Sequence, residues 1–256
     1  MIRQLSLLAC AMAAGALAAA AGPAAASDAP AKAGGGAARP LDMNGYWTAV
    51  RTPRPKDFNN GGWDGPGPNP PPLTPWALDY VKTYKDNEKK GIVVSGPSQA
   101  CEPKGMPYNM EHMLPMDFVQ RPDELVILIE ERSMPRHIYL DGRKHTPDDE
   151  LLASSNGESI GHWEGKVLVV DTVGIMDSTL LTIDRIPHSE ALHIVEHISL
   201  SDDGKIMTDA ITMMDPKTFT QPWTITMRYG RAPADTRAVE YICTVDDHRL
   251  KGFDKR

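Results

Sequence analysis

The sequence lacks the motifs that would assign it to several common classes of enzyme or binding protein. It has no P-loop and no Rossmann glycine pattern, so a nucleotide enzyme is not supported. It also lacks a basic excess, since 27 Lys and Arg stand against 34 Asp and Glu. This balance argues against a nucleic-acid partner. No organic cofactor is expected.

Long hydrophobic runs are absent after residue 26, so no transmembrane segment is expected in the mature chain. Residues 1–26 differ from the rest. Arg3 supplies a basic start, an apolar Ala-rich stretch follows, and small residues end at Ala26. These three parts are typical of a secretory signal peptide. We therefore predict an exported protein, periplasmic if the host has an outer membrane.

Cysteine is scarce, with three in the chain. Cys10 leaves with the signal peptide, so Cys101 and Cys243 remain. In an oxidising compartment an isolated pair most often forms a disulfide. We predict that Cys101 and Cys243 are bridged, and two unrelated buried thiols are the alternative.

The mature chain divides into a tether, residues 27–40, and one β-rich domain, residues 41–256. The tether is composed mainly of Ala, Gly and Pro, which is typical of a flexible linker. Residues 52–75 are rich in Pro and Gly and predict a long loop that could cover a site. A helix then begins with Thr74 as N-cap and ends at Gly91. Its expected apolar face carries Trp76, Tyr80, Val81 and Tyr84.

Short apolar runs dominate the chain after about Asp117. They are Leu125–Glu131, Arg136–Leu140, Val167–Thr172, Ala191–Leu200, Ile206–Met214, Trp223–Tyr229 and Val239–Thr244. Turn signals separate several of them, including Pro122-Asp123, Glu164-Gly165 and Asp203-Gly204. We expect about eight to ten antiparallel strands in a meander. Closing the sheet into a lipocalin- or calycin-like barrel would protect its edges.

Longer sequence blocks in the second half of the chain suggest a family. They are Asp141–His145, Asn156–Gly165 with Leu168–Thr172, Pro187–Glu196, Asp215-Pro216 with Pro222–Thr224, and Glu240–Cys243. Together they resemble a family of exported bacterial proteins of unassigned activity, over about Cys101 to Arg249. The resemblance implies no established reaction. His197 departs from the family pattern, which usually has Arg there.

Residues His193–His197 fit the H-x-x-E-H pattern of zinc proteases. That chemistry requires a helix, where both His can bind one zinc ion. The alternating Leu192, Ile194 and Ile198 indicate a strand instead. On a strand the two His would lie roughly 13 Å apart and could not share one ion. We therefore assign no metal ligands from this motif, and the sequence leaves open whether the histidines bind a metal together.

The strand interpretation places carboxylates on apolar faces. Glu196 falls in register with Ile194 and its apolar neighbours, and Asp209 and Asp171 do the same in their own strands. Arg136 and Arg228 are candidate partners. The cluster is either a set of structural ion pairs or a polar patch in a barrel cavity, where burial raises a carboxyl pKa.

Several histidines lie near these carboxylates in the sequence. His188 and His193 flank the start of the Glu196 strand, and His137 and His145 bracket another hairpin. The candidate catalytic residues are Glu196, His193, His188 and Asp209. The candidate ligand-binding residues are His137, His145, Trp163 and Arg228.

A methionine-rich segment is a further feature. Its members are Met106, Met110, Met113 and Met116, with His112 among them. Thioether and imidazole groups suit Cu(I). The same spacings are equally typical of a buried helical face.

Two functions are consistent with this sequence. The first is an exported β-barrel that binds a small apolar or aromatic molecule in its cavity. The second is a cofactor-independent acid–base enzyme, a lyase, isomerase or hydrolase, that uses a buried Glu/Asp–His site there. The sequence leaves open whether the chain is an enzyme. Convergence of a carboxylate and a His inside the cavity would favour the enzyme.

Overall fold

The computed structural model describes residues 41–50, 70–92, 101–111, 115–130, 134–182, 185–237 and 239. All of them belong to one compact unit, residues 38–256. The predicted signal peptide and tether lie outside the described residues, as do His112, Met113, Cys243 and most of the Pro/Gly-rich loop. The pairing of Cys101 with Cys243 stays a prediction, because Cys243 lies outside the described residues.

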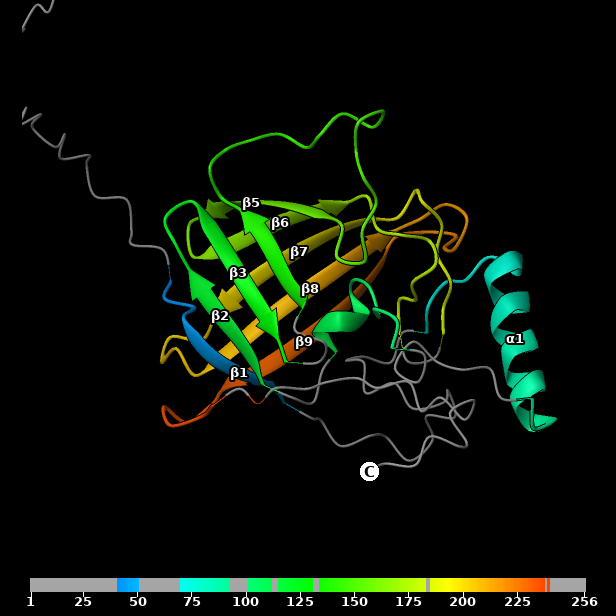
Figure 1. Cartoon of the computed structure of the whole chain (residues 1–256), viewed down its shortest axis with the longest axis horizontal. Helices are drawn as coiled ribbons and strands as arrows, with labels where there is room; N and C mark the ends of the chain where they lie inside the picture. The colour runs from blue at the N-terminus through cyan, green and yellow to red at the C-terminus, as the bar shows by residue number, and fades with distance from the viewer. Residues whose placement is uncertain are drawn as a thin grey trace, which may run out of the picture. The chain divides into compact units, whose positions relative to one another are not determined.

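The described residues form a mainly β structure with a closed barrel (Figure 1). Its strands are β1 (Gly45–Ala49), β2 (Met116–Gln120), β3 (Glu124–Ile129), β4 (Met134–Tyr139), β5 (Glu158–Glu164), β6 (Val167–Val173), β7 (His193–Leu200), β8 (Ile206–Met214) and β9 (Trp223–Arg231). Each strand pairs with the next, and β9 returns to pair with β1. Closure leaves no free sheet edge, as the sequence predicts.

Predicted turns connect several of these strands. Glu164-Gly165 precedes β6, and Asp203-Gly204 joins β7 to β8. Gly165 and Gly204 have φ values of 60° and 67°, a region where a glycine has no steric penalty. The turn residues thus explain where the antiparallel hairpins reverse. The last predicted run, Val239–Thr244, falls almost wholly outside the described residues.

One strand pair differs from the predicted antiparallel meander. β4 and β5 are parallel, with Ile138 opposite Ser159 and Tyr139 opposite Ile160. Residues 140–157 separate the two strands, which is long enough to return the chain to the end where β4 began. A short turn would have forced the antiparallel arrangement.

Helix α1 (Pro75–Lys89) begins as the sequence predicts, because the Thr74 side chain accepts a hydrogen bond from the backbone N–H of Ala77. Its predicted apolar face is confirmed only in part, at Val81, which packs against the core. Ala77 is its buried residue, whereas Trp76 and Tyr80 are 39% and 46% exposed. Within the described part of the chain, no helix is long and apolar enough to cross a membrane.

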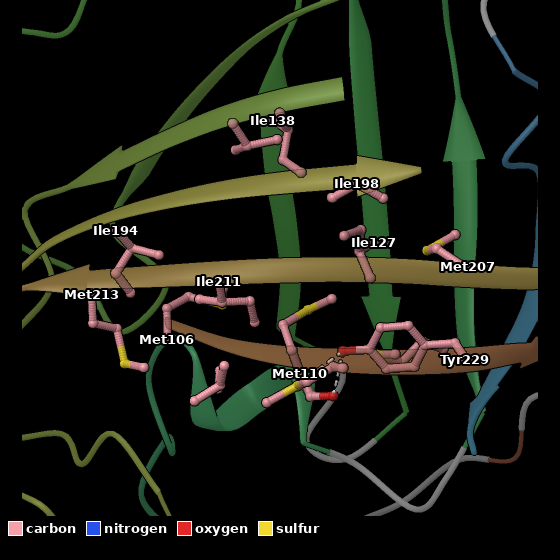
Figure 2. Packing of buried hydrophobic residues seen from close by; sticks show 14 of the residues in the cluster. Met106, Met110, Ile127, Ile138, Ile194, Ile198, Met207, Ile211, Met213 and Tyr229 are labelled. Carbon is pink, nitrogen blue, oxygen red and sulfur yellow. Dashed lines mark hydrogen bonds between the residues drawn. The ribbon is translucent and has the colours of Figure 1, made fainter. Parts of the chain in front are cut away.

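Alternate strand residues fill the barrel interior with apolar side chains. Figure 2 shows Ile127, Ile138 and Ile211 in this packing. Met106 and Met110 join it from the segment before β2, and the Tyr229 hydroxyl donates a 3.0 Å hydrogen bond to the Met110 carbonyl oxygen. These methionines therefore serve as core side chains.

Candidate functional site

An ion pair lies buried in the barrel interior. Arg136 on β4 and Glu196 on β7 are 1% and 0% exposed. Arg136 Nη1 donates a 2.9 Å hydrogen bond to Glu196 Oε1, and Nη2 donates a second to Oε2. This two-bond fork is the strongest geometry for an Arg–carboxylate contact. Glu196 therefore faces inward, as its strand register predicts, and it meets the cation that it requires.

Two hydroxyl groups extend the ion pair across the sheet. Arg136 Nη2 also donates to Ser159 Oγ on β5 and Thr172 Oγ1 on β6, each at 3.2 Å. The two hydroxyl oxygens are 2.8 Å apart, and their residues face each other across the β5–β6 pair. Neither Ser159 nor Thr172 was predicted as a site residue from the sequence. Polar residues at inward positions of otherwise apolar strands are the signal that could have found them.

Asp209 on β8 is the third charged residue of this interior cluster, and it is 1% exposed. Its side chain forms a hydrogen bond with Glu196, which requires one of the two carboxyl groups to hold a proton, and Arg136 Nε has no hydrogen-bond partner among the described residues. Burial, reinforced by the negative charge of Glu196, raises the pKa of Asp209 well above its usual value, although Arg136 opposes this. The uncharged form of Asp209 is thus favoured beside an ionised Glu196.

The apolar surroundings strengthen these electrostatic effects. Tyr229 on β9 is fully buried, and burial is the main cause that raises the pKa of its hydroxyl well above its usual value. Trp47 and Phe118 are also buried in the core. Charges interact more strongly in such a medium than in water.

His193 does not join this cluster. It lies three residues from Glu196 on β7, and side chains at odd spacings on a strand point to opposite faces. His193 Nε2 lies 2.9 Å from each carboxylate oxygen of Asp171 on the outer face of the barrel. The predicted approach of His193 to Glu196 is therefore wrong.

Asp171 also points outward, contrary to the register expectation. It shares the outer face of β6 with Val167 and Val169, whereas Leu168 and Val170 are buried inside. Both faces of this strand are apolar, so the register of Asp171 with valines did not identify the interior.

His145 connects Asp171 to a second carboxylate, forming an outer-face cluster of Glu158, His145, Asp171 and His193. His145 Nδ1 lies 2.9 Å from Glu158 Oε1, and Nε2 lies 2.9 Å from Asp171 Oδ1. Burial opposes ionisation of Glu158, but hydrogen bonds from Thr146 and His145 outweigh it and lower the Glu158 pKa. No three His, Cys, Asp or Glu side chains of the described ranges are placed to hold a metal ion.

His188 lies away from both clusters and is 3% exposed. Its Nε2 is 2.9 Å from Thr179 Oγ1, and its Nδ1 is 3.0 Å from the Ser189 carbonyl oxygen. Burial lowers the pKa of His188, so the neutral ring is favoured. Its contacts are with the loops between β6 and β7, and they include neither Glu196 nor Asp209.

The remaining predicted residues are dispersed. His137 is exposed and lies 2.7 Å from Glu124 Oε1. Arg228 is exposed on the outer face of β9, so it is not the partner of Glu196. Trp163 is partly buried and packs against the core. The structure therefore does not bring the four predicted ligand-binding residues to one site.

No family model matches this chain, and no curated protein matches it. The resemblance to a family of exported bacterial proteins stays a prediction. What the geometry establishes is an interior cluster of Arg136, Glu196 and Asp209, supported by Ser159 and Thr172.

Proposed function

We propose that the protein is exported and binds a small, mainly apolar or aromatic molecule inside its barrel. Arg136 Nε and the Asp209 oxygen that does not take part in the hydrogen bond with Glu196 have no partner among the described residues, and they support this proposal. They lie among buried apolar side chains, where a hydrogen-bonding group without a partner costs about 1–3 kcal/mol. A ligand that supplies the missing partners would recover that free energy.

The composition of the interior supports an apolar occupant. Its aromatic residues include Trp47, Phe118 and Trp223, and flexible methionines such as Met110 and Met227 lie among them. Methionine adapts its shape to irregular ligands. Closed barrels of about this strand number can hold one small molecule. The Gly45-Tyr46-Trp47 sequence on β1 agrees with a lipocalin-like relationship, which we include in the proposal.

A cofactor-independent acid–base enzyme is the second candidate. The raised pKa of Asp209 beside ionised Glu196 favours it, because an uncharged carboxyl at neutral pH can act as a general acid. Glu196 is a weaker candidate for the base, since Arg136 binds both of its oxygens. His188 and His193 bond elsewhere, so this chemistry would rest on Asp209.

Identification of a retained molecule tests the binding function. The exported protein would be purified, extracted with organic solvent and examined by mass spectrometry, and then titrated with the fluorescent probe aminoanthracene. Ile211→Phe would fill the interior two residues from Asp209, whereas Thr224→Phe would add the same ring to the outer face.

We expect a stoichiometric small molecule and saturable probe binding. Ile211→Phe should weaken probe binding by about tenfold or more, and Thr224→Phe should leave it unchanged. Near-ultraviolet circular dichroism would confirm that both variants fold. An empty extract together with no saturable probe binding would contradict the proposal. Turnover of an extracted compound that is lost in Asp209→Asn would favour the enzyme.

A further inference from the structure

We propose that His145 is a proton-dependent latch, which fastens the connection between β4 and β5 to the outer face of the barrel and releases it when the ring loses its proton. This connection comprises residues 140–157. The latch acts at the surface and does not depend on what the barrel binds. It follows from the number of protons that the contacts of His145 require.

The first part of this connection is attached to the barrel mainly at His145 and Thr146. These two residues are partly buried, whereas the others from 141 to 150 are exposed. The Thr146 backbone N–H and hydroxyl donate hydrogen bonds of 2.8 and 2.7 Å to the Glu158 carboxylate on β5. His145 contacts the same carboxylate and also Asp171 on β6. Polar contacts with two carboxylates therefore hold this part of the connection in place.

Both ring nitrogens of His145 face carboxylate oxygens. Nδ1 lies 2.9 Å from Glu158 Oε1, and Nε2 lies 2.9 Å from Asp171 Oδ1. An ionised carboxylate can only accept hydrogen bonds, and a neutral imidazole has only one N–H to donate. In the neutral ring, one nitrogen would therefore present its lone pair to a carboxylate oxygen. The imidazolium has an N–H on each nitrogen, so it satisfies both contacts.

The surrounding hydrogen bonds place the extra proton on the His145 ring rather than on a carboxylate. Burial opposes ionisation of Glu158, but the hydrogen bonds that it accepts from Thr146 and His145 lower its pKa overall. Asp171 serves as an acceptor for His193 on β7, whose Nε2 lies 2.9 Å from both of its oxygens. A neutral His193 can make this contact, since one N–H is enough. His145 is therefore the member of the outer-face cluster whose contacts require a positive charge.

The charged neighbours within the connection keep their charge while histidines titrate. The Arg143 guanidinium donates hydrogen bonds of 2.6–3.0 Å to the Asp141 carboxylate and lies 3.8 Å from the centre of the Tyr139 ring. Arg143 also interacts electrostatically with Glu158, and Lys144 is exposed. Asp, Arg and Lys side chains ordinarily stay ionised between roughly pH 5 and 8. The change of charge in this range therefore comes from histidine.

Amide exchange of Thr146 reports on the latch directly, because its N–H donates to Glu158. Its protection factor, corrected for the pH dependence of chemical exchange, would be measured by NMR on the purified protein. The measurements would run from about pH 5.5 to about pH 8.5, which spans the range where histidine side chains change charge. We expect protection to fall about tenfold or more as the pH rises. The ring signals of His145 should titrate over the same interval.

Two substitutions of His145 separate the effect of charge from that of shape. His145→Gln is neutral at every pH, so Thr146 should have throughout the low protection that the wild type has at high pH. His145→Arg carries a permanent charge and several N–H donors, so it should retain protection over the whole range. His162→Gln is the matched control, because His162 is an exposed histidine on β5 that contacts Glu164. It should follow the wild-type profile.

Protection of Thr146 that stays constant with pH in the wild type would overturn the latch. Full protection in His145→Gln at the acidic end of the range would also overturn it, since the ring would then be unnecessary. Equal loss of protection in His145→Arg and His145→Gln would show that charge does not decide the attachment. Circular dichroism over the same pH range would show whether the barrel stays folded. If the barrel unfolds as protection falls, the change is global and the proposal fails.

Discussion

At the scale of single residues, the Arg136–Glu196 pair dominates the energetics of the barrel interior. Glu196→Gln would remove the carboxylate that Arg136 binds through both terminal nitrogens, and restoring a counter-charge would require the buried Asp209 to release its proton. Removing one partner of a buried pair typically costs about 3–5 kcal/mol. We expect a loss of that size in the free energy of unfolding, measured by urea denaturation. His197→Gln, on the exposed side of the same strand, should change it by no more than about 0.5 kcal/mol.

A double substitution separates charge imbalance from lost packing. Replacing Arg136 and Glu196 together by methionine removes both charges at once, and such replacements are often neutral or stabilising. The double variant should therefore be more stable than Glu196→Gln. If Glu196→Gln lost less than about 1 kcal/mol, the single charge would be tolerated and the ion pair would not be a structural requirement.

Asp209 should make the free energy of unfolding depend on pH in a way that the Asp209→Asn variant does not show. An unfolded chain ionises Asp near pH 3.9, whereas the folded chain holds the Asp209 proton to higher pH because its pKa is raised. Between these two pKa values the folded state binds the extra proton. The stabilisation from Asp209 is thus complete below the unfolded pKa and is lost as the pH rises, by up to about 1.4 kcal/mol per pH unit.

The measurement is a series of unfolding free energies from pH 4 upwards. The stability of Asp209→Asn relative to the wild type should increase with pH, whereas Asp79→Asn on the exposed surface of α1 should show no such trend. A constant difference between Asp209→Asn and the wild type would contradict a raised pKa for Asp209.

At the scale of elements, turn residues and alternation predicted the strands well. The Asp203-Gly204 turn and the alternation in β8 place Asp209 inside, and the structure agrees. The same reasoning failed for Asp171, because β6 has valines outside and apolar residues inside. The parallel β4–β5 pair was missed because pairing direction depends on the long connection between those strands.

The histidines show what sequence reasoning does not supply. His193 and His188 are near Glu196 in the chain, but strand alternation turns one outward and a loop carries the other elsewhere. The convergence of Arg136 on Glu196 depends on the order of four strands around the barrel, from β4 to β7. The spacing of residues along one strand does not indicate the order of the strands around the barrel.

The N-cap of α1 gives a prediction at this scale. Thr74 accepts a hydrogen bond from the Ala77 N–H and donates one to the Lys217 carbonyl oxygen at 2.6 Å. Thr74→Ala removes both, and loss of a cap typically costs about 1 kcal/mol. We expect a loss of at least this size in thermal or urea unfolding. Thr83→Ala, on the exposed part of the same helix, should cause no loss, since Ala favours helix. Equal effects of the two variants would contradict the capping role.

At the scale of the whole molecule, the free energy of unfolding depends on pH through more than one buried group. Burial of the neutral His188 ring should change it with pH in the direction opposite to Asp209. The lowered pKa of His188 means that the unfolded chain binds a proton near pH 6.5 before the folded chain does. Its stabilisation is complete above that pH and is lost as the pH falls towards the folded pKa.

His188→Asn should therefore reduce the loss of stability on acidification below about pH 6.5, even though the variant is less stable at neutral pH. His197→Asn, on the exposed side of β7, is the control and should keep the wild-type slope. Unfolding free energies measured in half-unit steps of pH would distinguish the two variants. If the unfolding free energy of His188→Asn depended on pH in the same way as that of the wild type, the loss of stability in acid would not arise from His188. It would not arise from Asp209 either, because Asp209 acts in the opposite direction.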